Sequence, residues 1–427
     1  MTADGRLHIA QFVHRYPPAL GGSEAYGRRL CQSFAECGDR VTVFTTTAVE
    51  LSDFHTRSRT ALSTDEDSGA LRIRRFRPIT FPLRRYVFKA LSLFPHRPWQ
   101  AATQPSGPVC PDMATAAASF DEPLDAVHAM AFPYSFPILC AERLARRRGV
   151  PFFVTPFLHL GDPLDPHDLT RRQYSRPHLR WLLKRADGVF VQTPSEARAA
   201  VGLGVPENRV HLQGLGVDAA ECTGGDREKA RAEWGLAPGE FAVGHLANAS
   251  VEKGTVDLLQ AAAAESIRVI LAGPAMPNFE RFWTRFERKE LVTRLGPLSD
   301  SQKRDFYAGI DAFALPSRTD SFGLVLLEAW ANAKPVIAYR AGGPADLVRD
   351  GADGWLVPCG DVGALAGVLR TCAEHPELRA AFGAMGCARI AGEFEWGPKL
   401  ELVRRVIGGT RANFVSASSC IRRSRDR

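Results

Sequence analysis

Short apolar runs alternate with longer segments of helical spacing along most of this 427-residue chain. The first run, Arg6–Val13, has the length of a buried strand, and the helix predicted after it runs to Glu36. Val41–Thr45 then predicts a second strand. A strand, a helix and a strand in this order form the βαβ unit of a doubly wound sheet, so the chain is predicted to be α/β.

The alternation continues through the first half of the chain and then starts again. Further strands are predicted at Ala70–Phe76, Leu124–Ala129, Pro151–Thr155, Ala186–Gln192 and Arg209–Gln213. Phe241–Leu246 opens a second βαβ series. We therefore expect two Rossmann-like doubly wound domains, over residues 1–214 and 215–395.

Two segments depart from this alternation. Residues 80–120 contain six prolines and are predicted to be irregular. A helix is predicted over residues 396–410. The chain from Gly408 onward mixes Gly, Ser, Thr and Arg, and residues 411–427 are predicted to be a mobile basic tail.

The composition is ordinary for a soluble protein, with 45% apolar and 24% charged residues. The nine cysteines include no C-x-x-C pair, so the sequence does not suggest a zinc site. No signal peptide precedes the first strand, and no apolar span reaches 18 residues. These features together predict a cytoplasmic protein with free thiols.

The net charge of +7 is unevenly distributed. One acid-free stretch carries the basic residues Arg72, Arg74, Arg75, Arg77, Arg84, Arg85 and Lys89. Bulky apolar residues are interleaved with them, a pattern that suits peripheral contact with an anionic membrane or an anionic acceptor. A strand and loop with solvated arginines would give the same pattern. Nucleic acid is disfavoured as a partner because no nucleic-acid-binding motif accompanies the charge.

The stretch Pro316–Glu328 holds the strongest candidate chemistry. The apolar run Ile310–Leu315 reads as a buried strand, and after a short polar turn Leu324–Ala333 reads as a helix. The first N–H groups of a helix have no partner within the helix, and together with the helix dipole they attract anions such as phosphate. Gly323 would let a ligand approach the backbone closely.

Two acidic residues bracket this turn. Asp320 precedes the helix and Glu328 lies about two turns along it, roughly 12 Å away along the axis. That separation fits a sugar, a diphosphate and a ribose, with Asp320 facing the sugar and Glu328 accepting from the ribose hydroxyls. In the alternative interpretation, Asp320 is a helix N-cap and Glu328 is an ordinary helix carboxylate.

The run from Leu315 to Pro358, with its Lys334-Pro335 and Gly342-Gly343-Pro344 segments, closely resembles the C-terminal signature of glycosyltransferase family 4. Members of that family are retaining enzymes of the GT-B fold that use sugar nucleotides. The family usually has two glutamates at the spacing of Asp320 and Glu328. In this chain the first of these two positions holds Asp320, an acid with a shorter side chain.

This resemblance implies that the two domains face each other across a cleft. Residues 1–214 would bind the acceptor and residues 215–395 the sugar nucleotide, and the helix at 396–410 would cross back to the first domain. The reaction implied is the transfer of a sugar from a nucleotide-diphosphate sugar to a glycan, a lipid-linked or a small-molecule acceptor. It would need no metal or other cofactor, and it would proceed by front-face attack.

The resemblance also implies roles for individual residues. The donor site would comprise Gly22, His245, Lys253, Leu298, Asp320, Ser321, Phe322, Gly323, Leu324 and Glu328. The acceptor site would comprise Gly21, Gly22, His128 and His159. The catalytic residues would be Asp320, His159 and Lys253.

Three histidines are candidate residues of the predicted site. His128 and His159 are predicted to lie beyond the carboxyl ends of strands, where ligands bind in open α/β sheets. A lone histidine is more often a structural hydrogen-bonding residue, and the family resemblance favours His159 over His128. His245 stands where the family usually has an arginine that binds the donor diphosphate, and its charge would depend on pH.

Two other functions are compatible with the sequence. A sugar-nucleotide epimerase can have the same two-domain architecture. A non-catalytic relative that binds a glycan or a sugar nucleotide is the other alternative, and the histidine at position 245 is the feature that favours it.

Overall fold

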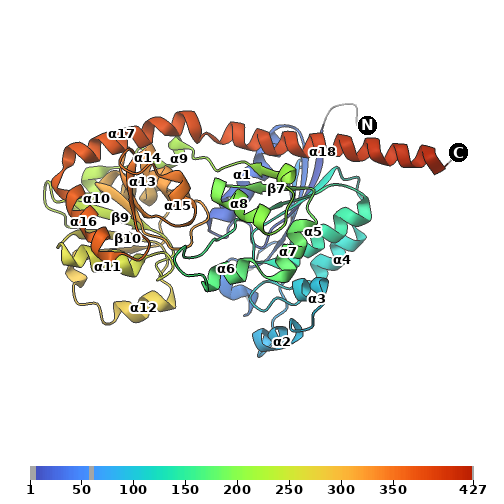
Figure 1. Ribbon diagram of the computed structural model, residues 1–427, viewed down its shortest axis with the longest axis horizontal. Helices are drawn as coiled ribbons and strands as arrows, with labels where there is room; N and C mark the ends of the chain where they lie inside the picture. Colours follow the sequence, from blue (N-terminus) through green and yellow to red (C-terminus); the bar gives the residue numbers. More distant parts are fainter. Residues whose placement is uncertain (1–5, 57–61, 426–427) are drawn as a thin grey trace.

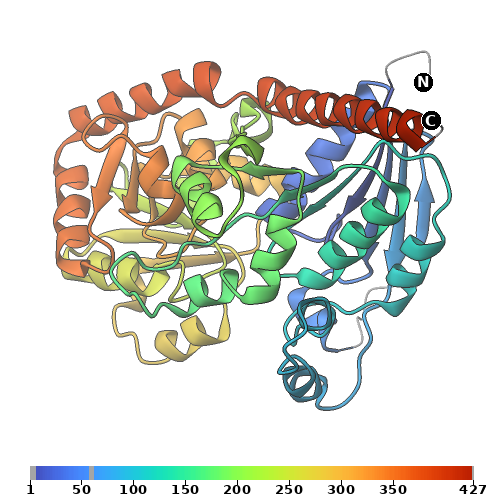
Figure 2. The same ribbon diagram turned by 45° about the vertical axis from the view of Figure 1, so that its right-hand side comes forward.

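The computed structural model describes residues 6–56 and 62–425. Two α/β domains lie next to each other, and the long C-terminal helix runs along the first of them (Figure 1). A view turned by 45° shows the strands of the first domain lying between layers of helices (Figure 2). In the part of the chain that the structure describes, no helix combines the length and the apolar character needed to cross a membrane.

The first domain is built on an eight-stranded sheet with the order β3-β4-β2-β1-β5-β6-β7-β8. Its strands are β1 (His8–Phe12), β2 (Arg40–Thr46), β3 (Asp65–Asp67), β4 (Leu71–Phe76), β5 (Ala126–Met130), β6 (Phe152–Thr155), β7 (Gly188–Val191) and β8 (Val210–Leu212). All neighbouring strands are parallel except β3, which pairs antiparallel with β4 at the edge. Its helices are α1 (Gly22–Glu36), α2 (Arg84–Leu91), α3 (Arg97–Ala102), α4 (Pro111–Ser119), α5 (Ser135–Arg148), α6 (Leu169–Tyr174), α7 (Pro177–Lys184) and α8 (Pro194–Gly202).

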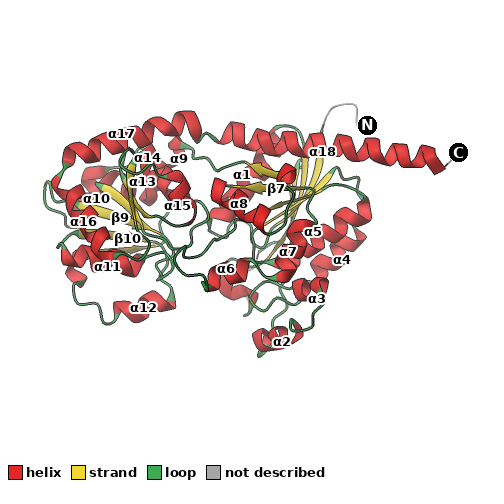
Figure 3. Cartoon of the chain, viewed as in Figure 1, coloured by secondary structure: helices red, strands yellow, loops and turns green. Residues whose placement is uncertain are grey.

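The second domain is built on a six-stranded, fully parallel sheet with the order β11-β10-β9-β12-β13-β14. Its strands are β9 (Ala242–Leu246), β10 (Arg268–Ala272), β11 (Val292–Gly296), β12 (Ala312–Leu315), β13 (Val336–Tyr339) and β14 (Gly354–Val357). The helices are α9 (Ala219–Cys222), α10 (Arg227–Glu233), α11 (Thr255–Ala264), α12 (Pro277–Trp283), α13 (Asp300–Gly309), α14 (Leu324–Ala331), α15 (Gly342–Leu347), α16 (Val362–Glu374) and α17 (Pro376–Glu393). Helices flank the strands in both domains (Figure 3).

The central strands are short apolar runs because helices cover both faces of each sheet. All residues of β1, β5 and β12 are buried. In a parallel sheet of this kind the ligand-binding edge lies at the carboxyl ends of the strands. The protein therefore has two edges of this kind, one at the carboxyl ends of the strands of each sheet.

The segment at 80–120 is more ordered than its prolines suggest, because it contains α2, α3 and α4. Pro98 is the second residue of α3 and Pro111 is the first residue of α4. Proline is compatible with the first turn of a helix, where its missing N–H would have no intrahelical partner. These prolines begin helices instead of interrupting them, so the prediction of an irregular segment was wrong here.

The last helix, α18, runs from Trp396 to Arg425 and returns along the first domain (Figure 1). Ion pairs of Arg404 with Asp39 at 2.7 Å and of Arg411 with Asp125 at 2.7 Å hold it there. The helix therefore continues past residue 410, where it was predicted to end, as far as Arg425; the mobility predicted for this basic segment stays a prediction. The last two residues of the predicted tail lie outside the described residues.

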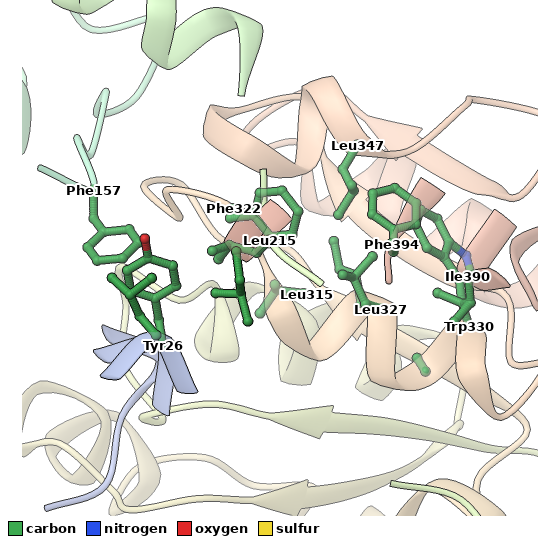
Figure 4. Close-up of a cluster of buried hydrophobic side chains, with 14 of the residues drawn as sticks. Tyr26, Phe157, Leu215, Leu315, Phe322, Leu327, Trp330, Leu347, Ile390 and Phe394 are labelled. Atoms are coloured by element: carbon green, nitrogen blue, oxygen red, sulfur yellow. The ribbon is translucent and has the colours of Figure 1, made fainter. Parts of the chain in front are cut away.

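One apolar cluster continues from the first domain into the second. Tyr26 of α1 and Phe157, after β6, meet edge to face, with their ring centroids 5.3 Å apart. Leu215 leads from them towards Phe322 of the second domain, and the cluster extends to Trp330 of α14 (Figure 4). Shared apolar packing therefore joins the domains beside the residues predicted to bind the ligand.

Candidate functional site

A cavity of about 390 Å³ lies between the two domains and is lined by both. Many of the residues predicted to form the site line it: Gly21, Gly22, His159, Lys253, Asp320, Ser321, Phe322, Gly323 and Leu324. A larger hollow of about 880 Å³ lies beside α12, but its lining contains none of the predicted residues. The chemistry predicted from the sequence therefore converges on the smaller, interdomain cavity.

Asp320 and Lys253 form an ion pair inside this cavity, with 2.6 Å between Nζ and Oδ2. Their side chains are 16% and 24% exposed. Burial by itself would raise the pKa of Asp320, but the Lys253 ammonium outweighs it, and the pKa is lowered overall. Asp320 is therefore an anion at neutral pH, next to the cation predicted to contact a diphosphate.

The N-terminus of α14 forms the adjoining wall of the cavity. Gly323 begins the helix in a left-handed conformation, with φ of 95°, which other residues adopt only with strain. The Phe322 N–H donates to Asp320 Oδ1 at 3.3 Å. The start of the helix, which has no side-chain cap, faces the cavity and can receive an anion.

The glycine pair at the start of α15 packs directly behind this turn. The Gly343 N–H donates to the Asp320 carbonyl at 2.8 Å. A Cβ atom on Gly343 would come within 2.5 Å of the Phe322 nitrogen. The second glycine of Gly342-Gly343-Pro344 thus allows α15 to support the backbone between Asp320 and Gly323.

His159 lies on the opposite wall of the cavity, in the loop after β6. Its ring packs against Tyr174 of α6, with the ring centroids 4.9 Å apart. Burial, reinforced by the nearby Lys253 cation, lowers the pKa of His159 to about 4. His159 is therefore neutral at physiological pH, so it can donate or accept a hydrogen bond but supplies no fixed charge.

A cluster of charged residues from the first domain also lines the cavity, and no role was predicted for it from the sequence. Glu24 of α1 contacts Arg15 at 2.6 Å and His14 at 3.2 Å, and it accepts a hydrogen bond from Ser23 at 2.8 Å. Burial opposes ionisation of Glu24, but His14 and Arg15 lower its pKa to about 2. The sequence does contain a signal for this cluster: His14 and Arg15 come directly after a strand, and Glu24 lies in the next helix.

Gly21 and Gly22 connect this cluster to the second domain. A Cβ atom on Gly22 would lie 3.7 Å from Cδ1 of Leu324 on α14. The glycine loop of the first domain therefore approaches the start of α14 closely. The residues predicted to contact both substrates lie together here, although their individual roles stay predictions.

His128 does not lie where the sequence analysis placed it. It is inside β5, fully buried, and its ring nitrogens pair with Gln11 Oε1 and Thr155 Oγ1, both at 2.8 Å. Burial lowers its pKa to about 3. The ring is a neutral hydrogen-bonding group in the sheet, so its assignment to the acceptor site was wrong.

His245 is also part of the core. It lies in β9, fully buried, and its ring pairs with the Ala314 carbonyl at 2.8 Å and with Thr255 Oγ1 at 2.9 Å. Burial lowers its pKa to about 4. The prediction that His245 contacts the donor diphosphate is therefore incorrect, because the ring is neutral and both of its nitrogens are occupied by protein groups.

Glu328 and Leu298 lie outside the lining of the cavity. Glu328, on α14, contacts Lys303 at 2.9 Å and accepts a hydrogen bond from the Tyr307 hydroxyl at 2.7 Å. Leu298 is half-buried between β11 and α13. Their proposed contacts with the ribose and the base remain predictions.

Polar contacts cross between the domains at two places near the cavity. Arg318, in the same turn as Asp320, contacts Asp162 of the first domain at 3.2 Å and Asp257 of its own domain at 2.6 Å. Ser195 of α8 donates to Asp346 of α15 at 2.9 Å. Within residues 6–56 and 62–425, no group of three or more His, Cys, Asp or Glu side chains is placed to hold a metal ion.

Two doubly wound domains with a cavity between them define a protein of the GT-B class. Two family models match the chain: "Glycosyl transferase 4-like domain" over residues 21–216 and "Glycosyl transferases group 1" over residues 226–387. Both matched models describe glycosyl transferases, and together they cover most of the chain.

Sequence relatives include D-inositol 3-phosphate glycosyltransferases. The protein from Nocardia farcinica is 34% identical over 231 residues, which are 50% of this chain and 51% of the relative. The protein from Mycobacterium tuberculosis (strain H37Ra) is 34% identical over 228 residues, 50% of this chain and 47% of the relative. The matched region thus spans about half the length of these relatives.

Similar folds occur in solved structures. Sucrose-phosphate synthase from Thermosynechococcus elongatus has a TM-score of 0.72 and 22% identity, covering 95% of this chain and 100% of that one. HepE from Anabaena, in complex with UDP and glucose, has a TM-score of 0.70 and 20% identity, with the same coverage. At these identities the similarity establishes the fold.

Proposed function

We propose that this protein is a glycosyltransferase that moves a hexose from a nucleotide-diphosphate sugar to an acceptor held by the first domain. The observation that carries the proposal is the Asp320–Lys253 ion pair at the start of α14, inside an interdomain cavity. The two family-model matches and the glycosyltransferase names of the sequence relatives support it. HepE, a neighbour in fold, was solved with UDP and glucose, which supports a sugar nucleotide as donor.

In this proposal the donor diphosphate lies between Lys253 and the first N–H groups of α14. Both stabilise negative charge as the diphosphate departs, and they are in place before the reaction begins. When the donor binds, Asp320 would give up part of its contact with Lys253 and accept hydrogen bonds from the sugar hydroxyls. Because Lys253 and the helix N-terminus supply positive potential, we propose that no metal ion is required.

Arg15 is the second cation proposed to act at this site, in place of His245. Among the described residues that line the cavity, Arg15 and Lys253 carry the permanent cationic groups. Arg15 is held by Glu24 in the first domain, so it would reach the donor from across the cavity. The acceptor would lie on the same side, near His159 and Gly22, and attack the sugar from the face that the diphosphate leaves. This geometry would retain the anomeric configuration.

The proposal can be tested with a panel of UDP-, GDP-, ADP- and dTDP-sugars, with binding measured by calorimetry and thermal shift. We expect one donor to bind, and to bind equally well with EDTA present. Lys253→Ala should weaken that binding, and loss of one such charge-stabilising donor typically adds about 3 kcal/mol to the reaction barrier. Lys229→Ala, an exposed lysine of the same domain, is the matched control.

Two results would contradict the proposal. One is the absence of binding for every sugar nucleotide, with or without a divalent metal. The other is equal donor affinity in Lys253→Ala and the wild type. Release of free sugar or transfer to an added acceptor, with retention of configuration, distinguishes a transferase from an epimerase, which interconverts the sugar without any acceptor.

A further inference from the structure

The corner formed by α2 and α3, residues 81–99, exposes an unusual amount of apolar surface. Of the 17 large hydrophobic side chains that are exposed among the described residues, eight lie in this segment. Leu83, Tyr86 and Leu93 are 72%, 72% and 76% exposed, and Phe94 is 63% exposed. The corner projects from the lower edge of the first domain in the view of Figure 1. Apolar side chains gathered on a projecting corner indicate an interaction surface.

The corner is held in a defined shape. Arg84 and Phe88 form the inward face of α2, and the Arg84 guanidinium lies 4.7 Å from the centre of the Phe88 ring. The Trp99 indole N–H donates to the Leu91 carbonyl at 2.8 Å, which ties α3 to the end of α2. The exposed apolar residues therefore lie on two ordered helices and on the short segments that flank and join them.

The charge of this region is entirely of one sign. From Ser68 to Pro111 the sequence contains no Asp or Glu. Arg72 and Arg75, at the sheet, are neutralised by Glu122 and Glu66. In contrast, Arg77, Arg85 and Lys89 are exposed. Arg172 of α6, Arg176 before α7 and Arg180 of α7 are exposed, and α7 packs against α3.

We propose that the α2–α3 corner docks on an anionic lipid bilayer. Exposed Leu, Phe and Val side chains would enter the boundary between head groups and acyl chains, and Tyr86 and Trp99 have the amphipathic rings that favour that boundary. Arg85 and Lys89, on the same short helix, would contact anionic head groups. A protein partner could cover the apolar residues, but the absence of any acidic residue over 44 positions matches a uniformly anionic surface.

The corner is linked to the catalytic cavity through Arg84. Its guanidinium contacts His55 Nδ1 at 2.9 Å, and His55 lines a hollow of about 330 Å³. That hollow also includes His159 and Tyr174, which line the interdomain cavity as well. A protein docked by this corner would hold the acceptor side of the cavity close to the bilayer. This consequence rests on the proposed function, whereas the docking itself does not.

Vesicle co-sedimentation tests the docking directly. The full chain is mixed with vesicles of phosphatidylglycerol and phosphatidylcholine in equal parts, and separately with vesicles of phosphatidylcholine alone. We expect binding to the anionic vesicles and little binding to the neutral ones. Leu93→Ser/Phe94→Ser and Arg85→Glu/Lys89→Glu should each lower the affinity by roughly tenfold or more. Met385→Ser, an exposed apolar residue of α17, is the matched control and should bind like the wild type.

The docking proposal is overturned if the wild type does not bind anionic vesicles, or if either double variant binds them as the wild type does. It is also overturned if the corner mediates a dimer, seen by sedimentation equilibrium without vesicles and abolished by Leu93→Ser/Phe94→Ser. Thermal unfolding checks that each variant is folded. Donor binding, measured in solution on the same variants, should stay unchanged, so failure of docking is distinguishable from failure of the proposed transfer.

Discussion

Asp320 faces the cavity with its charge balanced by Lys253, and that arrangement leads to a specific kinetic expectation. Asp320→Asn removes the anion while conserving size and one acceptor oxygen. We expect kcat to fall by roughly 100-fold, as for loss of a well-placed polar group in an active site, while the affinity for the nucleotide diphosphate alone changes little. Steady-state kinetics and calorimetry with the nucleotide separate these effects. Equal losses in both would contradict a sugar-facing role.

Histidine roles could not be assigned from sequence position alone. His128 and His159 both come near the ends of predicted strands, yet His128 lies inside β5 and His159 in the loop that faces the cavity. A shift of one or two residues in the end of a strand decides whether a ring is buried between helices or open to a ligand. His245 shows the same effect at the end of β9.

The turn between β12 and α14 depends on close packing by α15. Gly343→Ala would place a Cβ atom within 2.5 Å of the Phe322 nitrogen and so displace the turn that carries Asp320. We expect a loss of about 1–3 kcal/mol in stability and weaker donor binding. Gly367→Ala is the control, since a Cβ atom there meets nothing within 4 Å and lies inside α16. That variant should be stabilised by about 0.5–1 kcal/mol. Similar behaviour of the two variants in thermal unfolding and donor binding would refute the packing argument.

Helix α8 carries a buried acid that should make stability depend on pH. Glu196 accepts hydrogen bonds from the backbone N–H groups of Leu158 and Gln192, both at 2.6 Å. Burial raises the pKa of Glu196 to about 7, against an ordinary value of 4.5. Between these values the folded state binds more protons than the unfolded state, so the contribution of Glu196 to stability decreases as pH rises from about 4.5 to 7.

The variant Glu196→Gln isolates this contribution. Its single carbonyl oxygen cannot serve both backbone N–H groups as the two carboxyl oxygens do, so we expect it to be less stable than the wild type at pH 5. The difference in free energy of unfolding between the two proteins should shrink by about 2.5 kcal/mol as pH rises from 5 to 8, because the wild type then carries a buried charge. Thermal unfolding midpoints of both proteins across this range provide the measurement. A difference that stays constant with pH would show that Glu196 does not titrate in this window.

Secondary structure was predictable where the apolar pattern was regular. The strands β1, β2, β4 to β9 and β12 fall close to the expected runs, and the central ones are apolar because helices cover both of their faces. The exposed edge strand β3, Asp65–Asp67, was not predicted. The region of α2–α4 was not predicted, since proline marks both turns and helix starts. Which of the two occurs depends on packing against α5 and α7, which is not encoded locally.

Arg318 makes one of the ion pairs that join the two domains. Arg318 belongs to the turn that carries Asp320, and it reaches across to Asp162 of the first domain. Asp162→Asn should weaken this contact and make opening easier, raising KM for the donor about two- to fivefold, as expected for a partly exposed ion pair. X-ray scattering should show a larger radius of gyration. Asp165→Asn, in the same loop but with a local hydrogen bond to His167, is the control and should change neither value.

The sequence by itself determined the two βαβ series, the acidic and glycine-rich turn at 316–328 and the family resemblance. Each of these depends on residues close together in the chain. Tertiary structure alone decided that Glu24 and Arg15 meet the Asp320–Lys253 pair in one cavity, that His128 and His245 are buried, and that the apolar residues of α2 and α3 remain exposed. The physical reason is that burial and charge pairing depend on which distant segments pack together, and no local pattern specifies those contacts.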